Sequence, residues 1–171
     1  MDRIELFEYF IFKSLKHNGA LDNDLSILKS IKLLFFFSTV SEGNNDDFLL
    51  PIFGSVKAMP LGHVITDVYT AMKQNSPLSF FIFNKNGVNL KVSSVDESKF
   101  SEEIRREVDN RFELLLSLNP DILKMTAYQL VELSHKWFSW DYYFSQARRN
   151  GQLSMEIPLE VIKSERKIYK L

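Results

Sequence analysis

The chain has 171 residues, and its 21 basic and 22 acidic side chains give a formal net charge of −1. This length suits one domain with a sizeable core, and the absence of cysteine excludes disulfides, thiolate chemistry and cysteine metal sites. The near-neutral balance carries no electrostatic footprint for nucleic acid or an anionic membrane, so neither is expected as a partner.

Residues 1–20 predict an N-terminal helix. Gly19 stands just beyond an expected helix end near His17. Acidic as well as basic side chains occur at its start, which is not the pattern of a signal peptide. The apolar positions that recur at helical spacing are Ile4, Phe7, Ile11 and Leu15.

A second helix is predicted from a cap at Asp24 or Ser26 to about Val40. The run from Leu33 to Phe37 is apolar nearly all round and much too short to span a bilayer. It therefore indicates a buried helix that lies centrally in the fold.

The next stretch gives weaker patterns. Ser41 to Asp47 is a polar loop, and Phe48 to Pro60 predicts irregular backbone or a very short strand. Gly62 to Gln74 returns to helical spacing through Val64, Val68 and Met72, so a helix is expected there.

Residues 78–92 carry the one clear β pattern. Asn86-Gly87 favours a tight hairpin turn with positive backbone dihedrals, between an apolar strand and an alternating one. The first strand is apolar on both faces, with Phe80 and Ile82 on one and Phe81 and Phe83 on the other. Either helices cover both faces, or one phenylalanine face meets a partner protein.

A long helix is predicted from Asp96 or Ser98 to Asn119-Pro120. Its mixed charged face from Glu102 to Arg111 indicates a solvated surface with weak ion pairs, or a surface that steers a charged protein partner. The opposite apolar stripe consists of Phe100, Ile104, Val108, Phe112 and Leu115.

Two shorter helices meet at a tryptophan-rich elbow. Thr126 and Gln129 fit a capping box, so one helix begins near Ala127. A second is expected after a cap at Ser139, ending at Gly151. Two tryptophans three positions apart, Trp137 and Trp140, bury a large area there, and each indole N–H requires an acceptor.

The C-terminal part predicts one more helix, with Pro158 as its first residue. Together these elements predict a mainly helical α+β domain, in which a small antiparallel hairpin at about residues 78–92 packs on a helical bundle. One domain spans residues 1–171.

Catalytic motifs are not found in the sequence. Neither a metal-ligand spacing, a nucleophile turn nor a glycine-rich phosphate loop occurs, so no enzyme activity, metal or cofactor is predicted. An acid/base pair of His135 with Asp141 or Glu132 is conceivable, but a histidine beside a carboxylate at a helix junction is more often a structural lock.

Four segments resemble the Panacea domain family, which includes the SocA and GepA types of antitoxin. They are KLLFFFSTV (32–40), KAMPLGHVITDVYTAM (57–72), ELSHKWFSWDYYFSQA (132–147) and IPLEVI (157–162). The resemblance covers about residues 25–167 and leaves the N-terminal helix outside. Its structural signature is Gly62, His135 and Trp140, although His63 follows Gly62 where the family usually has Pro-Val.

The resemblance implies an antitoxin of a bacterial or phage toxin-antitoxin system, acting in the cytoplasm by binding a cognate toxin and occluding its active site. An alternative is a proteolytic adaptor that delivers a toxin or another client to a AAA+ protease. Homo-oligomerisation stays open, and near-neutral charge argues against autoregulatory DNA binding. The residues expected to contact the partner are Met59, His63, Phe81, Phe83 and Trp137.

Overall fold

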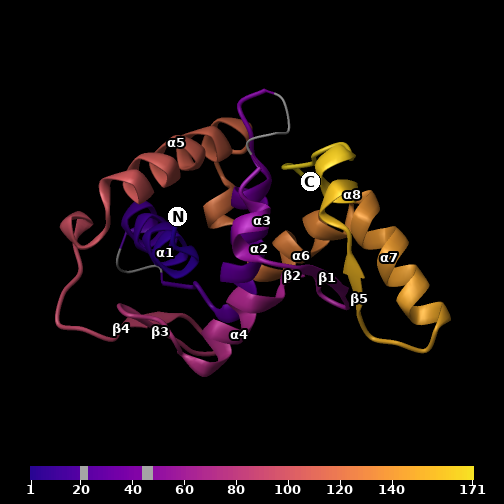
Figure 1. The fold of residues 1–171 in the computed structure, drawn as a ribbon, viewed down its shortest axis with the longest axis horizontal. Helices are drawn as coiled ribbons and strands as arrows, with labels where there is room; N and C mark the ends of the chain where they lie inside the picture. Colours follow the sequence, from indigo (N-terminus) through magenta and orange to yellow (C-terminus); the bar gives the residue numbers. More distant parts are fainter. Residues whose placement is uncertain (20–22, 44–47) are drawn as a thin grey trace.

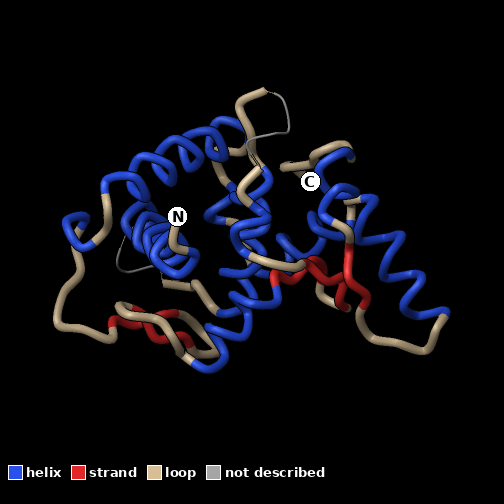
Figure 2. The backbone as a smooth tube through the Cα atoms, in the orientation of Figure 1, coloured by secondary structure: helices blue, strands red, loops and turns tan. Residues whose placement is uncertain are grey.

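A computed structural model of the chain describes residues 1–19, 23–43 and 48–171, which form an α+β fold that is mainly helical (Figures 1 and 2). Its helices are α1 (Arg3–Asn18), α2 (Ile27–Thr39), α3 (Leu50–Phe53), α4 (Thr66–Gln74), α5 (Glu102–Leu118), α6 (Ala127–His135), α7 (Phe138–Arg149) and α8 (Leu159–Ser164). Its strands are β1 (Val56–Met59), β2 (Gly62–Ile65), β3 (Phe81–Phe83), β4 (Val88–Leu90) and β5 (Met155–Ile157), and two 3₁₀ turns are η2 (Glu97–Lys99) and η3 (Ile122–Lys124).

Helix α1 begins and ends where its sequence requires. The Asp2 side chain accepts from the backbone N–H of Glu5 at 2.8 Å, and Gly19 follows the helix with a φ of 77°. The predicted N-terminal helix is therefore confirmed.

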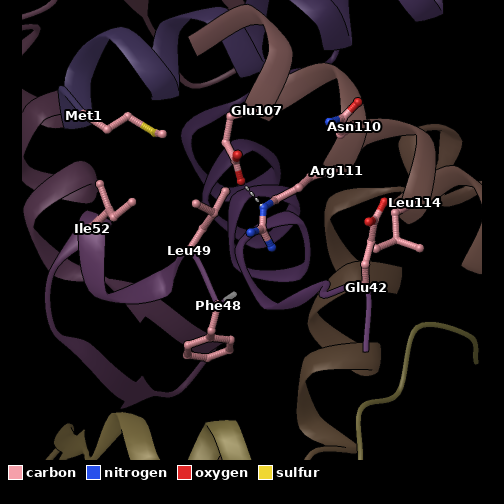
Figure 3. A pocket seen from close by; sticks show the side chains of 9 residues that line it. All are labelled: Met1, Glu42, Phe48, Leu49, Ile52, Glu107, Asn110, Arg111 and Leu114. Carbon is pink, nitrogen blue, oxygen red and sulfur yellow. Dashed lines mark hydrogen bonds and ion pairs between the residues drawn. The ribbon is translucent and has the colours of Figure 1, made fainter. Parts of the chain in front are cut away.

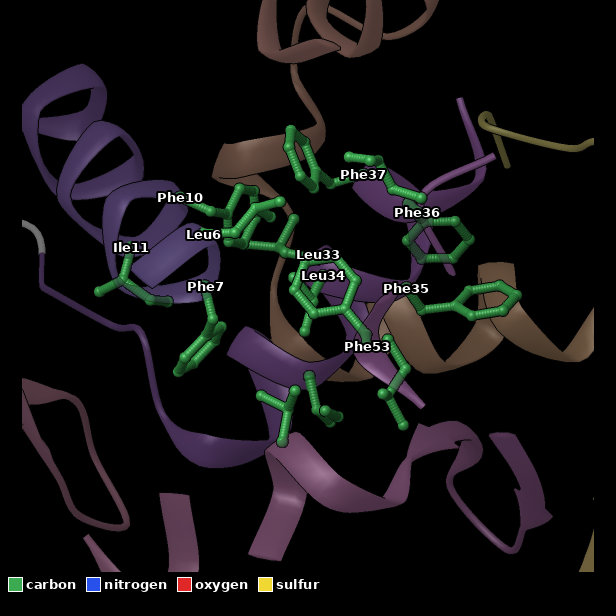
Figure 4. Packing of buried hydrophobic residues seen from close by; sticks show 14 of the residues in the cluster. Leu6, Phe7, Phe10, Ile11, Leu33, Leu34, Phe35, Phe36, Phe37 and Phe53 are labelled. Carbon is green, nitrogen blue, oxygen red and sulfur yellow. The ribbon is translucent and has the colours of Figure 1, made fainter. Parts of the chain in front are cut away.

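Helix α2 is the central element, as predicted. Ser26 caps it, and every residue from Lys29 to Thr39 is buried. It contacts α1 and α5 on one side and β2 and α6 on the other (Figure 1). Rings of α1 and α2 meet directly, with Phe10 and Phe37 at a centroid distance of 4.6 Å (Figure 4).

The prediction for residues 48–65 was partly wrong. Residues 50–53 form the short helix α3, and β1 and β2 form an antiparallel hairpin with Met59 opposite Gly62. The helix predicted from Gly62 begins at Thr66. All four residues of β2 are buried because the strand packs against α2 and α6, so its inward and outward faces give no alternating pattern.

Strand β5 was not predicted. It pairs antiparallel with β1 and gives a three-stranded sheet in the order β2-β1-β5. The strand has three residues and pairs with a segment about a hundred positions earlier, so no local pattern could reveal it. Pro158 is the N-cap of α8 rather than its first residue, so the helix begins one residue later than predicted, at Leu159.

The β3–β4 hairpin confirms the predicted β segment but not its turn. Neither Asn86 nor Gly87 has a positive φ; instead the Asn84 side chain accepts from the N–H groups of both, at 2.8 and 3.0 Å. A Cβ on Gly87 would lie 2.8 Å from the carbonyl oxygen of Asn23, so glycine is needed there for close approach.

Helix α5 carries its predicted apolar stripe on the buried side, but it begins at Glu102, with Ser101 as the cap. Asp96 caps η2 instead. The capping box of Thr126 and Gln129 is present at α6. Ser139 lies inside α7 rather than at its cap, and the Glu165 carboxylate accepts the backbone N–H of Ser139 at 2.9 Å.

One contiguous apolar cluster runs from Leu6 in α1 to Ile162 in α8. Among the described residues, no helix is long and apolar enough to cross a membrane.

Candidate functional site

The residues of the sequence signature converge beneath the turn between β1 and β2. Gly62, the first residue of β2, has a φ of 96°. An added Cβ would overlap the Ser134 hydroxyl, lie 2.9 Å from the Ser134 Cβ and approach the Lys32 Cε to 3.3 Å. Glycine is therefore required both for the backbone conformation and for the close approach of β2 to α2 and α6.

His63 is fully buried and uses both ring nitrogens. Its Nδ1 lies 2.7 Å from the Ser134 Oγ and its Nε2 lies 2.8 Å from the Ser139 Oγ. The ring stacks on Phe35 with a centroid distance of 3.9 Å. Burial, reinforced by the charges of Lys32 and His135, lowers the pKa of His63 well below its ordinary value, so the imidazole is neutral at pH 7.

Lys32 lies beside this histidine without a carboxylate partner among the described residues. Its Nζ donates to the His63 carbonyl oxygen at 2.5 Å, and the side chain is fully buried. Burial lowers the pKa of Lys32 to about 7. We call Lys32, His63, Ser134 and Ser139 the buried polar cluster.

His135 and Trp140 support the same turn from the other side. Their rings stack with centroids 3.6 Å apart, and the Trp140 Nε1 donates to the Met59 carbonyl oxygen at 2.8 Å. Burial lowers the pKa of His135, against the opposing effect of its hydrogen bond to the Pro60 backbone. No ion pair joins His135 to Asp141 or Glu132 in the described part of the chain; its contacts are the Trp140 ring and the Pro60 backbone.

An open groove lies above this cluster, between α2, the β1–β2 turn, α4 and the start of α6. Its volume is about 620 Å³, and apolar side chains dominate its wall. Leu61 and Tyr128, 43% and 69% exposed, stand at its edge. The lining residues are Ser26, Ile27, Leu28, Ile31, Lys32, Met59, Pro60, Leu61, Val64, Tyr69, Lys73, Lys85, Ala127 and Tyr128.

The predicted partner contacts need correction. Met59 lines the groove, but His63, Phe81 and Trp137 are fully buried and Phe83 is nearly so. Trp137 donates from its Nε1 to the Ile168 carbonyl oxygen at 2.8 Å, which satisfies its polar group inside the core. These four side chains have no surface to offer a partner.

The two faces of β3 are likewise resolved. The Phe81 and Phe83 face packs inward, and Phe80 packs on Phe100 with a centroid distance of 5.2 Å. Ile82 is exposed. The Phe81 and Phe83 face is therefore covered and cannot meet a partner, while the face of Phe80 and Ile82 is covered only in part.

A smaller hollow of about 340 Å³ lies between α3 and α5 (Figure 3). Its Arg111 is already engaged: Nε lies 2.5 Å from the Glu107 carboxylate and Nη1 donates to the Val40 carbonyl oxygen at 2.6 Å. This guanidinium ties α5 to the end of α2, so its contacts are structural.

Sequence reasoning missed Lys32, Ser134 and Ser139 as members of one cluster, and Leu61 and Tyr128 as groove residues. The available signal was a lysine within an otherwise apolar helical run. Among the described residues, no group of acidic or histidine side chains could hold a metal ion.

Comparison of the chain with protein-family models, with curated proteins and with solved structures gave no match.

Proposed function

We propose that this protein is an antitoxin that acts in the cytoplasm by binding a cognate toxin directly. The sequence resemblance suggests the class of protein, and the open apolar groove is the observation that supports binding of another protein. Concave, mostly apolar sites with a few polar groups at the edge are typical binding sites. Met59, Leu61 and Tyr128 supply the contact side chains.

The groove supports occlusion by a preformed surface. Its β1–β2 turn is fixed from below by the buried polar cluster and by the hydrogen bond from Trp140 to Met59. A rigid surface loses little conformational entropy on binding, so more of the contact free energy appears as affinity. The proposed mechanism is coverage of the toxin's active site or substrate channel.

The test is co-expression with the product of the neighbouring open reading frame. That product should arrest growth alone and be neutralised by the wild-type protein. Leu61→Asp with Tyr128→Asp should weaken binding by at least about tenfold, because charges enter an apolar contact. Leu153→Asp with Leu171→Asp is the matched control, since these side chains are 75% and 53% exposed and lie outside the groove. A harmless neighbour, or equal rescue by all variants, would contradict the proposal.

A second surface favours the alternative of a proteolytic adaptor. Phe138 and Tyr142 are exposed on α7 and stack with centroids 5.6 Å apart. They lie on the helix face opposite Trp140, which packs inward. An adaptor needs separate surfaces for client and protease. As an adaptor, the protein with Phe138→Asp and Tyr142→Asp should lengthen the partner's half-life in the presence of a AAA+ protease and ATP without weakening partner binding.

A further inference from the structure

The groove is electrostatically one-sided. Three lysines and no acidic residue belong to its described lining. Lys73, in the last turn of α4, and Lys85, in the β3–β4 turn, are exposed, and their ammonium groups take part in none of the side-chain hydrogen bonds or ion pairs between described residues. The rim therefore offers two available ammonium groups above an apolar floor.

The N-terminal ends of two helices add to the positive charge at the groove. Ile27 begins α2 and Ala127 begins α6, and both line the groove. The N-terminal end of a helix carries a partial positive charge that favours anionic groups within its first turn. Side-chain charges and helix dipoles thus agree in selecting a ligand with negative charge.

The floor selects for apolar side chains as well. Ile27 and Leu28 lie along it above the buried Ile31 and Val64, with Met59 and Leu61 at the turn. An amphipathic helix places its anchors at positions i, i+3, i+4 and i+7, which span about two turns. Such a row of apolar anchors suits an open groove with an apolar wall.

We propose that this groove binds an acidic amphipathic helix of the partner protein. Its apolar anchors lie on the floor formed by α2 and the β1–β2 turn, and its carboxylates face Lys73 and Lys85. The inference rests on the proposed function, because the helix belongs to the protein that is neutralised.

The test uses two designed peptides of about five helical turns, or about 18 residues. Both have leucine at the anchor positions; one has glutamate and the other lysine elsewhere. Fluorescence anisotropy should show that the wild-type protein binds the glutamate peptide in preference, with affinity that falls as salt rises. Equal or stronger binding of the lysine peptide would overturn the inference.

Charge reversal at the rim provides the matched comparison. The double variant K73E/K85E should bind the glutamate peptide about tenfold more weakly, since each reversed rim charge changes affinity by roughly a factor of three. The double variant K99E/R106E changes the net charge equally at exposed positions outside the groove and should bind normally. Equal weakening in both would mean that only net charge matters and would overturn the site.

Other occupants give different results. A dimer that dissociates on Leu61→Asp in sedimentation would assign the groove to a second copy of this chain and overturn the inference. Saturable binding of decanoate without binding of the glutamate peptide would assign the groove to a small anionic amphiphile and would also overturn the inference.

If K73E/K85E still rescues cells from the toxin, the partner helix lies elsewhere although the antitoxin function stands. If the wild-type protein binds the glutamate peptide but rescues no cells, the antitoxin proposal fails and the groove chemistry stands.

Discussion

At the scale of single residues, His63 shows how burial decides the role of a side chain. By type it suits a binding surface, yet its ring nitrogens lie within hydrogen-bond distance of serines on two different helices. A neutral, fully buried imidazole with both nitrogens engaged fixes β2 to α6 and α7. Its position beneath the groove makes it a support for the surface rather than a part of it.

Gly62→Ala should lower the free energy of unfolding by about 2–4 kcal/mol, because the new methyl group combines a positive φ with overlap at Ser134. Chemical denaturation measures this. Gly151→Ala is the control: its φ is also positive, at 69°, but nothing lies within 4 Å of an added Cβ, so a loss of about 1 kcal/mol is expected. Equal losses of unfolding free energy in the two variants would show that the close approach at Gly62 does not contribute to stability.

Lys32 should make stability rise with pH. The pKa of Lys32 is about 7 in the folded protein, against an ordinary value of 10.5 that applies to the unfolded chain. Between these two pH values the side chain is therefore protonated in the unfolded chain and largely neutral in the folded protein. The free energy of unfolding should therefore increase by up to about 1.4 kcal/mol per pH unit in this window. Lys32→Met should flatten the slope in urea titrations at several pH values.

The control for that slope is Lys99→Met, which removes an exposed lysine of η2. It should leave the pH dependence as in the wild-type protein. A slope unchanged by Lys32→Met would mean that the ammonium is not desolvated in the folded state.

At the scale of elements, a buried carboxylate holds the β3–β4 hairpin to α1. Glu8 is 1% exposed and accepts the backbone N–H groups of Ser79, Phe80 and Phe81 at 3.0, 2.7 and 3.2 Å. The hairpin has only two strands and would be marginal alone. Its position therefore depends on this contact and on the packing of Phe81 and Phe83.

Glu8→Gln should reduce the free energy of unfolding by about 2 kcal/mol, because an amide cannot accept three N–H groups as a carboxylate does. Hydrogen exchange should accelerate first at the amide of Phe81. Glu5→Gln is the matched control: Glu5 accepts one N–H, from Ser101, at an exposed site, so a loss below about 0.5 kcal/mol is expected. Equal exchange rates in both variants would contradict the anchoring role.

At the scale of the whole molecule, α2 joins two sides. Helices α1 and α5 pack on one side of it, and α6 and strand β2 of the three-stranded sheet pack on the other (Figure 1). The apolar cluster is continuous from Leu6 to Ile162, and both tryptophans belong to one side of it. Neither side can lose its contact with α2 without exposing the phenylalanines of that helix.

The chain should therefore unfold in one cooperative transition. Tryptophan fluorescence, which reports on Trp137 and Trp140, and far-ultraviolet circular dichroism, which reports on all helices, should give coincident curves. Phe10→Ala creates a cavity beside α1, away from the segment that holds both tryptophans. It should lower the free energy of unfolding by about 3–5 kcal/mol as measured by either probe. Separated transitions would divide the chain into two folding units.

Sequence determined those elements whose signals are local. Ser26 and Thr126 cap helices through side chains three residues from their partners, and the stripe from Phe100 to Leu115 follows the helical period. The mainly helical α+β class and the hairpin near residues 78–92 follow from such short-range patterns.

Tertiary structure alone decided what depends on contacts between distant segments. Strand β5 exists because β1 pairs with it, Lys32 is buried because β2 packs against it, and the groove forms where α2, the β1–β2 turn and α6 meet. Which face of β3 is covered was settled by α1 and not by its own apolar residues on both faces. Burial is a property of the assembled core, so tyrosine is buried at Tyr9 and exposed at Tyr128 according to its neighbours.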